Sequence, residues 1–430
     1  MDLKVFKFGG ASVKNEEGVT NVVKILDAHK NEKIITVVSA TGKTTNALEE
    51  VVKSYFNQKG DADQLLQKIK DDHIKIMEAL GIFNEDSFAD LSDTFVEIDW
   101  MIEDEVQDEF NYIYDQIVSV GELVSSKILY HKALKEGLNV TWLDVRDIII
   151  TDNTYREAKV IWADTQARMD TKVLELMKTY DVVITQGFIG CSTENFNTTL
   201  GREGSDFSAG IFSYCLDAKS LSIWKDVPGI LTADPRLFEN VTKIDRLSYR
   251  EAIEMTYFGA KVIHPKTIKP LQNKNIPLYV RPFNDHKSFG TLITSDVDTV
   301  YPPVIVIESN QTLMHISTKD FSFVAEEHLS EIFAKLDHCR LKVNMMQNTA
   351  ISFSVAVQNN QRKIVMFIKD LSDKYTIVKD DGLELITVRH YDAATVDRMK
   401  IGKIVMFEET IRQTVRMAVK DVPLVVRKDL

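Results

Sequence analysis

An arginine and an aspartate stand four residues apart in a glycine-rich segment, at Arg202 and Asp206. The segment covers residues 190–206 and holds three glycines among Ser, Thr and Asn side chains. Glycines let backbone N–H groups approach an anion closely, and a helix N-terminus adds partial positive charge. We therefore expect the segment to bind an anionic group, the alternative being a plain strand-to-helix turn.

A lysine stands two residues before a glycine pair near the N-terminus, in the order Lys7, Gly9 and Gly10, and Ser12 follows. Paired glycines between a strand and a helix can cradle a phosphate, on which a lysine acts as a point charge. Such a sequence also occurs in ordinary tight turns, so these residues alone leave both interpretations open.

Each of these polar segments follows a short apolar run that predicts a buried strand. The four runs are Lys4 to Phe8, Lys33 to Ser39, Val182 to Thr185 and Leu221 to Trp224. Helices are predicted at Gly18 to His29, Phe207 to Cys215 and Tyr249 to Thr256, and closing strands at Ile276 to Val280 and Gly290 to Ile293. Because open α/β sheets bind ligands at the carboxyl ends of their strands, the turns predict one shared site.

The turn after the second strand contains Gly42-Lys43-Thr44, which looks like the end of a Walker A loop. That motif requires glycine five positions before Gly42, where this chain has Val37, so the P-loop interpretation fails. His264 precedes Pro265, a position that favours an extended backbone, and no nucleophile partner is evident. We therefore assign His264 no catalytic role.

A helical region is predicted from about residue 60 to residue 130. Residues 82–110 contain eleven Asp or Glu and no Lys or Arg, which favours a solvated helix face over a metal or cation site. Glu122 then falls inside an apolar stretch, and a buried carboxylate needs a partner. That partner is either a basic group of the core or a substrate ammonium group.

The composition is that of a soluble globular protein, with 44% hydrophobic and 27% charged residues. A length of 430 residues predicts two or three domains. The net charge of −12 argues against nucleic acid and against an anionic membrane as partners. The N-terminus has no apolar signal region, no run of 18 apolar residues exists, and the three cysteines show no CxxC spacing, so we expect a cytoplasmic protein.

Seven motifs together resemble the aspartate kinases of the amino acid kinase family. They are KFGGASV (7–13), VVSATGKTTNAL (37–48), SVGE (119–122), TQGFIG (185–190), TTLGREGSD (198–206), WKDVPGILTADPR (224–236) and FGAKVIHP (258–265). The resemblance spans nearly all of residues 4–293. It implies an α/β fold with an open, mostly parallel sheet between helices, in a catalytic domain of residues 1–298 where ATP and aspartate meet.

The resemblance also implies a role for each matching residue. Lys7 and Asp206 are the expected catalytic residues. Lys7 matches the lysine that contacts the transferred phosphoryl group, and Asp206, like Glu122, matches an acid that faces the aspartate ammonium group. Because the substrate carboxylate needs no general base, we expect Asp206 to orient Lys7 and the substrate and not to remove a proton. The expected aspartate-binding residues are Ser39, Thr45, Glu122, Phe188, Arg202 and Ser205. The expected ATP-binding residues are Gly9, Gly10, Ser12, Lys225, Asp226, Leu231, Arg236 and Lys261. ATP is expected with Mg²⁺, for which no protein ligand is identified.

Two positions depart from the family pattern. The commoner loop reads RGGSD, and Glu203 here replaces its first glycine, where it could restrict the backbone or repel a phosphate. Leu231 stands where an aromatic residue is frequent, which leaves the stacking partner of adenine open.

The last third of the chain, residues 299–430, predicts a regulatory domain. The predicted elements of this part are, in order, strands at Val304 to Ile307 and Leu313 to Ser317, a helix at Phe323 to His338, strands at Lys342 to Gln347 and Ala350 to Val357, a helix at Gln361 to Ser372 and a strand at Thr376 to Val378. This β-α-β-β-α-β order resembles an ACT domain. The segment from Leu383 to the end resembles a second, degenerate copy, made of Leu385 to Arg389, a short helical piece, Lys403 to Glu408 and Thr410 to Val419. One copy, about 311–380, is expected to be inserted in the other.

The resemblance implies ATP-dependent phosphorylation of the L-aspartate β-carboxylate to 4-phospho-L-aspartate, the first step of lysine, threonine and methionine biosynthesis. A homodimer or higher homo-oligomer is expected, with lysine or threonine as effector, or with ACT units that only dimerise. Because no further domain follows Leu430, a monofunctional enzyme is expected. The alternatives are a catalytically weak amino-acid sensor and a kinase for another acidic substrate; Lys7, Arg202, Asp206 and Lys261 together favour the kinase over the sensor.

Overall fold

The computed structural model describes residues 2–260, 263–295, 297, 300–320 and 322–422. They form two compact units. The N-terminal unit comprises residues 1–230, 243–253 and 262–298, and the C-terminal unit comprises residues 231–242, 254–261 and 299–430. The C-terminal unit therefore also takes in two short segments that precede residue 298 in the chain.

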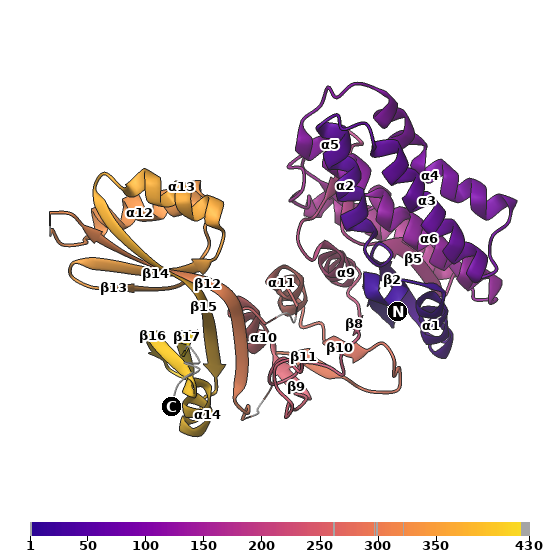
Figure 1. Cartoon of the computed structure of the whole chain (residues 1–430). Coiled ribbons are helices and arrows are strands. Elements are labelled where there is room, and N and C mark those ends of the chain that lie inside the picture. Colours follow the sequence, from indigo (N-terminus) through magenta and orange to yellow (C-terminus); the bar gives the residue numbers. More distant parts are fainter. Residues whose placement is uncertain (1, 261–262, 296, 298–299, 321, 423–430) are drawn as a thin grey trace, which may run out of the picture. The chain divides into compact units, whose positions relative to one another are not determined.

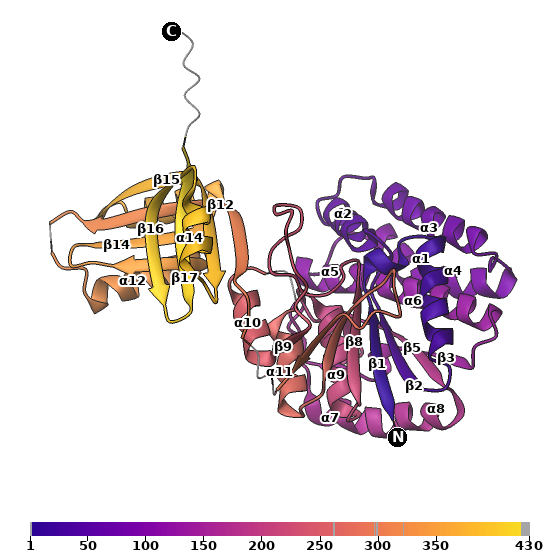
Figure 2. The same cartoon turned by 90° about the horizontal axis from the view of Figure 1, so that it is seen from below.

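The N-terminal unit is built around an eight-stranded, mostly parallel sheet with β1 near its middle. Only the pairing of β10 with β11 is antiparallel among the pairs of this sheet in the described chain. In order across the sheet, its strands are β3 (Val140–Leu143), β5 (Val182–Gln186), β2 (Lys33–Val38), β1 (Leu3–Phe8), β8 (Ser220–Lys225), β10 (Leu278–Pro282), β11 (Thr291–Thr294) and β9 (Arg246–Ser248). Figure 2 shows the central strands side by side. The predicted fold class is confirmed.

The register of the central strands brings the predicted turns to one edge of this sheet. Phe8 at the end of β1 lies opposite Val38 of β2 and opposite Trp224 of β8. Val38 in turn lies opposite Gln186, the last residue of β5. Since these strands are parallel, the chain leaves all four of them at the same edge, as the sequence predicted.

Helices cover both faces of the sheet. On one face, α6 (Val120–Lys135) packs against β3 and β5 and contacts α1 (Glu16–Ala28). On the other face, α9 (Gly204–Cys215) packs against β1, β2 and β8 and is covered by α11 (Pro265–Asn273). The remaining helices of this unit are the 3-10 helices Gly10–Val13 and Val145–Asp147, α2 (Thr44–Phe56), α3 (Ala62–Ala79), α4 (Glu85–Glu103), α5 (Phe110–Val118), α7 (Trp162–Arg168), the π-helix Met169–Val173 and α8 (Leu174–Thr179).

The segment 190–206 is not the single loop that its polar composition suggested. Residues Ile189–Ser192 form β6 and Asn197–Thr199 form β7, an antiparallel pair that joins β4 (Ile150–Thr151) in a three-stranded sheet. Helix α9 also starts earlier than predicted, at Gly204 and not at Phe207. Ser205 and Asp206 therefore lie in the first turn of α9, where a carboxylate is favourable.

The C-terminal unit holds a six-stranded antiparallel sheet, shown in orange and yellow in Figure 1. Its strands, in order across the sheet, are β13 (Val343–Asn348), β14 (Ser352–Gln358), β12 (Val304–Thr318), β15 (Tyr375–Arg389), β17 (Thr414–Asp421) and β16 (Lys403–Ile411). Its helices are α12 (Glu326–His338), α13 (Gln361–Leu371) and α14 (Ala393–Lys400), while α10 (Tyr249–Tyr257) begins in the N-terminal unit and ends in this one.

Two strands of this sheet are longer than predicted. The runs 304–307 and 313–317 belong to one fifteen-residue strand, β12, and the runs 376–378 and 385–389 belong to β15, also of fifteen residues. The two strands pair along their length, with a bulge between Glu308 and Gln311. Asn310 and Gly382 have φ of 59° and 75°, so each strand bends there without ending. The helix predicted from Phe323 begins at Glu326.

The long strands contribute to three hydrophobic clusters among the described residues, and one of these clusters, which includes Leu313, Met345, Leu385 and Phe407, contains residues from both halves of the sheet. Met314, Ile332, Phe353, Phe367 and Tyr375 belong to the core beneath α12 and α13, which contact each other (Figure 1). A second core includes Ile305, Ile386 and Val396, the last on α14. Each half of the sheet therefore has its own helical cover.

The thiols of Cys191, Cys215 and Cys339 are free and buried. No helix in the described part of the chain is both long enough and apolar enough to cross a bilayer.

Candidate active site

A buried ion pair joins Lys7 of β1 to Asp206 of α9 at the carboxyl edge of the large sheet. The Nζ atom of Lys7 lies 2.7 Å from Oδ1 of Asp206, and the two side chains are 10% and 6% exposed. Burial alone would raise the pKa of Asp206, but the charges of Lys7 and Lys225 and the hydrogen bond from Lys7 outweigh burial and lower it. Asp206 is therefore ionised at neutral pH and holds the ammonium group of Lys7 in place.

The turn after β1 runs beside this pair. The Ser12 N–H donates to the Gly9 carbonyl at 2.9 Å, which closes the turn into the 3-10 helix Gly10–Val13. A Cβ on Gly10 would come 2.6 Å from the Ala40 carbonyl oxygen, so only glycine lets the turns after β1 and β2 approach this closely. The side chain of Ser12 is buried, while Gly9 and Gly10 remain partly exposed.

Glu122 lies in the first turn of α6 and is 3% exposed. Its Oε1 accepts a hydrogen bond of 3.3 Å from the Ala40 N–H, and its Oε2 has no hydrogen-bond donor among the described residues. Burial raises the pKa of Glu122 to about 8, although the Ala40 N–H and the charge of Lys7 oppose the rise. Of the two partners expected from the sequence, the described structure shows no basic side chain bonded to Glu122.

The first turn of α9 packs tightly on the residues that follow β5. Phe188 has φ of 69°, and its N–H donates to the hydroxyl of Ser208, which itself donates to the Gly204 carbonyl. Phe188 therefore lies against Gly204, in the same first turn of α9 that carries Ser205 and Asp206. Sequence analysis did not single out Ser208, and its bond to Gly204 could not be inferred because the predicted helix began only at Phe207.

Arg202 and Glu203 lie just before α9, and both are exposed. No hydrogen bond or ion pair engages the Arg202 side chain within the described ranges, so its guanidinium is available to a ligand. Glu203 is the N-cap residue of α9 and has φ of 55° and ψ of 28°. It therefore adopts the left-handed conformation that favours glycine.

The predicted residues after β2 lie at the same edge. Ser39 directly follows β2, and its carbonyl accepts a hydrogen bond of 2.8 Å from the Ser125 hydroxyl of α6. Thr45 lies in the first turn of α2 and is partly exposed.

The predicted ATP-binding residues divide between the units. Lys225 ends β8, and Asp226 follows it, exposed. Leu231 and Arg236 belong to the C-terminal unit, where the Arg236 guanidinium lies 2.6 Å from the carboxylate of Asp234. Lys261 lies outside the described residues.

His264 caps α11, because its Nδ1 accepts a hydrogen bond of 3.1 Å from the Lys266 N–H. The acidic stretch 82–110 contains all of α4, whose buried residues include Leu91, Phe95 and Ile98. Among the residues described, no group of three or more His, Cys, Asp or Glu side chains could hold a metal ion.

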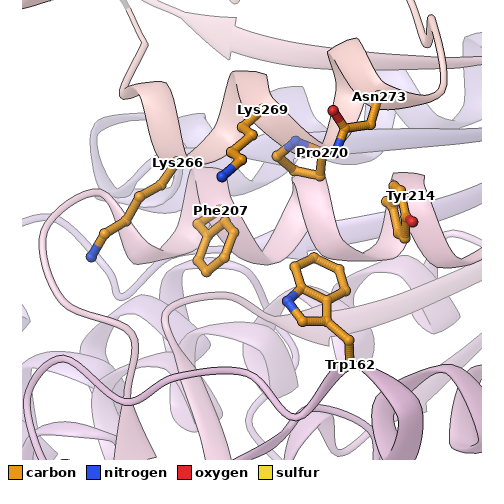
Figure 3. A pocket seen from close by; sticks show the side chains of 7 residues that line it. All are labelled: Trp162, Phe207, Tyr214, Lys266, Lys269, Pro270 and Asn273. Atoms are coloured by element: carbon orange, nitrogen blue, oxygen red, sulfur yellow. The ribbon is translucent and has the colours of Figure 1, made fainter.

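A pocket of about 400 Å³ opens between α7, α9 and α11. Figure 3 shows the rings of Phe207, Trp162 and Tyr214 together with the α11 residues Lys266, Lys269, Pro270 and Asn273. The lining residues are Trp162, Phe207, Tyr214, Lys266, Lys269, Pro270 and Asn273. None of them is a predicted site residue, and Phe207 and Tyr214 stand two helical turns apart on one side of α9. The chemistry suggested by the sequence therefore lies at the sheet edge and not in this pocket.

Known proteins are similar to this chain along most of its length. The model of the amino acid kinase family matches residues 2–282. Lysine-sensitive aspartokinase 3 of Escherichia coli (strain K12) is 29% identical over 364 residues, which are 83% of this chain and 78% of that protein. Bifunctional aspartokinase/homoserine dehydrogenase 2 of Arabidopsis thaliana is 32% identical over 307 residues, which are 69% of this chain but 33% of that protein.

The fold of the whole chain has solved counterparts. The crystal structure of E. coli aspartokinase III in complex with aspartate and ADP (R-state) superposes with a TM-score of 0.81 at 25% identity, and the match covers 97% of this chain and 96% of that one. The aspartate kinase of Clostridium acetobutylicum has a TM-score of 0.77 at 22% identity, with coverage of 97% and 96%.

Proposed function

Because the chain belongs to the amino acid kinase family, we propose that it is an aspartate kinase, which transfers the γ-phosphoryl group of ATP to the β-carboxylate of L-aspartate. The product is 4-phospho-L-aspartate. The observation that carries the proposal is the buried pair of Lys7 and Asp206, which places a fixed cation at the carboxyl edge of the sheet.

The reaction needs charge neutralisation more than proton transfer. The β-carboxylate of aspartate has an ordinary pKa of about 3.9, so the nucleophile is already ionised at neutral pH and needs no general base. Two anions must instead be brought together, and the developing charge on the phosphoryl oxygens must be stabilised. Lys7 is the proposed protein cation for this task, with Mg²⁺ arriving as part of the Mg-ATP substrate.

Aspartate binding is assigned to the residues around α9 and to Glu122. Arg202 offers an exposed guanidinium that can bind a carboxylate through two parallel hydrogen bonds. Glu122 offers a buried oxygen without a donor in the described structure, and the substrate ammonium group would supply one. Phe188, Ser205, Ser39 and Thr45 are the proposed lining residues of the same pocket.

ATP binding is assigned to the turns after β1 and β8. Gly9, Gly10 and Ser12 would hold the phosphates through backbone N–H groups, as glycine turns ahead of helices do. The further residues proposed to bind the nucleotide are Lys225, Asp226, Leu231, Arg236 and Lys261.

The C-terminal unit is proposed to be a pair of ACT-like domains. In support, residues 311–318 of β12 pair with 375–383 of β15, whereas residues 304–308 pair with 385–389. The chain order thus fits one copy, about 311–380, inserted in another. The name of the E. coli relative, "lysine-sensitive", supports lysine over threonine as the effector. We also propose that the chain forms a homodimer or a higher homo-oligomer.

The test is ADP release by the purified protein with Mg-ATP and aspartate, with glutamate and N-acetylglutamate as alternative substrates. Hydroxylamine traps the acyl phosphate as a hydroxamate, which separates phosphorylation from plain ATP hydrolysis. We expect aspartate-dependent hydroxamate, and we expect lysine to suppress it. A folded protein that binds lysine but forms no hydroxamate from any of these substrates would instead be an amino-acid sensor.

A further inference from the structure

Asp115 is a buried carboxylate that the proposed chemistry does not use. It lies in α5, and its side chain is fully shielded from solvent. Burial raises the pKa of Asp115 to about 6, against the opposing effect of hydrogen bonds from Arg156 and Thr199. Burying a carboxylate costs free energy unless hydrogen-bond donors surround it, so we expect Asp115 to have such donors.

Three donors converge on the two oxygens of Asp115. The Thr199 N–H donates to Oδ2 and the Thr199 hydroxyl donates to Oδ1, both at 2.8 Å. The Arg156 N–H reaches both oxygens, at 3.2 and 3.0 Å. None of the three donors is a basic side chain. The carboxylate binds two backbone N–H groups and one hydroxyl, and it thereby joins the segment around Arg156 to the segment around Thr199.

The two segments that Asp115 holds also contact each other beside Arg202. The Ala158 N–H donates to the Thr199 carbonyl at 2.9 Å. A Cβ on Gly201 would come 3.1 Å from the Arg156 carbonyl oxygen. Arg156 itself has φ of 71°, a conformation that needs support in a residue other than glycine.

Gln116, the residue after Asp115, binds β7, the strand that contains Thr199. Gln116 donates from its amide to the Asn197 carbonyl at 2.9 Å and accepts from the Asn197 N–H at 3.1 Å. Residues 115 and 116 of α5 therefore fix both ends of β7 (Asn197–Thr199), the strand that leads into Leu200, Gly201 and Arg202.

We propose that Asp115 is a positioning residue for aspartate, because it fixes the backbone of Thr199 and Arg156 and thereby directs Arg202 into the substrate pocket. The inference rests on the proposed function of Arg202. Asp115 itself contacts no substrate, and its contribution is confined to the carboxylate end of aspartate recognition. The nucleotide turns at Gly9 and Lys225 carry no bond to it in the described structure.

The first test compares Asp115→Asn with the wild-type chain. Asparagine keeps the shape but removes the charge and replaces one acceptor oxygen by a donor. The Thr199 hydroxyl can rotate to accept from that donor, but one of the two contacts of the Arg156 N–H becomes a donor–donor contact whichever way the amide lies. We expect the aspartate KM to rise about tenfold or more, toward that of Arg202→Ala, while the KM for Mg-ATP stays within twofold. An unchanged aspartate KM, or an equal rise in both KM values, would overturn the proposal.

A second pair of variants guards against a folding defect in Asp115→Asn. Thr199→Val removes only the hydroxyl donor, and Thr199→Ser keeps it. We expect Thr199→Val to raise the aspartate KM several-fold and Thr199→Ser to leave it within twofold of wild type. Thr165→Val serves as the stability control, because the buried Thr165 hydroxyl joins α7 to the Ile150 N–H of β4 and not to β7. A similar KM rise in Thr165→Val would attribute the effect to stability and overturn the proposal.

Hydrogen–deuterium exchange tests the positioning step without any turnover. In Asp115→Asn we expect faster exchange of residues 200–204 than in wild type, with the exchange of β1 and β8 unchanged. This readout separates the two proposals: a wild-type chain without aspartate kinase activity would refute the proposed function, whereas unchanged exchange of residues 200–204 would refute the role of Asp115.

Discussion

Gly187 and Ser205 approach so closely that a Cβ on Gly187 would come 2.6 Å from the Cβ of Ser205. Gly187 follows β5, and Ser205 lies in the first turn of α9 beside Asp206. The contact therefore sets how near the Asp206 carboxylate can come to the end of the sheet.

Gly187→Ala is expected to push the first turn of α9 away from β5 and to separate Asp206 from Lys7. We expect kcat to fall at least tenfold, together with a loss of about 1–3 kcal/mol in the free energy of unfolding from overpacking. Activity assays and urea unfolding measure the two effects. Gly60→Ala is the control, since a Cβ there meets no atom within 4 Å while φ of 80° still costs stability; a matching loss of kcat in Gly60→Ala would refute the steric explanation.

Lys7→Met should lower kcat by about 10²–10³-fold, the usual effect of removing one group that stabilises transition-state charge. It should also destabilise the fold by about 3–5 kcal/mol, because Asp206 is left as a buried charge without its partner. The double variant Lys7→Met/Asp206→Asn should regain most of the stability and none of the activity. Steady-state ADP release measures kcat of each variant, and urea unfolding measures its free energy of unfolding. Near-normal turnover of Lys7→Met would remove Lys7 from the mechanism.

The aspartate KM should depend on pH through Glu122. With its pKa raised to about 8 by burial, Glu122 is mostly protonated in the free enzyme at pH 6.5, and only the ionised form can receive the substrate ammonium group. Binding below pH 8 therefore releases a proton, so the aspartate KM should fall about tenfold or more between pH 6.5 and 8.5. Glu122→Gln should bind aspartate weakly with a flat profile over this range, and the KM for Mg-ATP should show no such fall in wild type.

Glu203→Gly should stabilise the chain. The left-handed conformation costs an ordinary residue about 1–2 kcal/mol, and glycine recovers this minus about 0.5–1 kcal/mol of unfolded-chain entropy. A gain of about 0.5–1 kcal/mol in urea unfolding is the expected result. Glu203→Ala separates the backbone effect from the charge, because it removes the carboxylate but keeps the Cβ; an equal gain in both variants would assign the effect to charge.

Local sequence patterns predicted the central strands and the edge where the site lies. Lys7, Ser39 and Lys225 each stand at or near the end of a β-branched or apolar run, and strand ends of this kind are set by the residues nearby. The pairing of Lys7 with Asp206 followed from a resemblance to a family and could not be read from spacing, since 199 residues separate them.

Other features depended on contacts between distant segments. The strands β6 and β7 are only four and three residues long; β6 contains a glycine and β7 consists of Asn and Thr, so neither carries a clear alternation of apolar residues. The start of α9 at Gly204 depends on the left-handed conformation of Glu203, which no propensity favours. Asp115 binds residues 41 and 84 positions away in the chain, so only the folded chain brings its partners to it.

The bulge in the C-terminal sheet separates an outer half, residues 311–383, from the rest of the unit along β12 and β15. Glu308 lies opposite Leu385 and Gln311 lies opposite Leu383, so the chain passes into the outer half of the sheet and returns from it on neighbouring strands. The outer half keeps its own core between β12, β14, α12 and α13. Leu313, Met345, Ala356 and Leu383 also pack with Leu385, Phe407 and Ala418 of the other half. A foreign domain exchanged for residues 311–383 would therefore need an antiparallel pair of terminal strands and also apolar side chains on this face of the sheet.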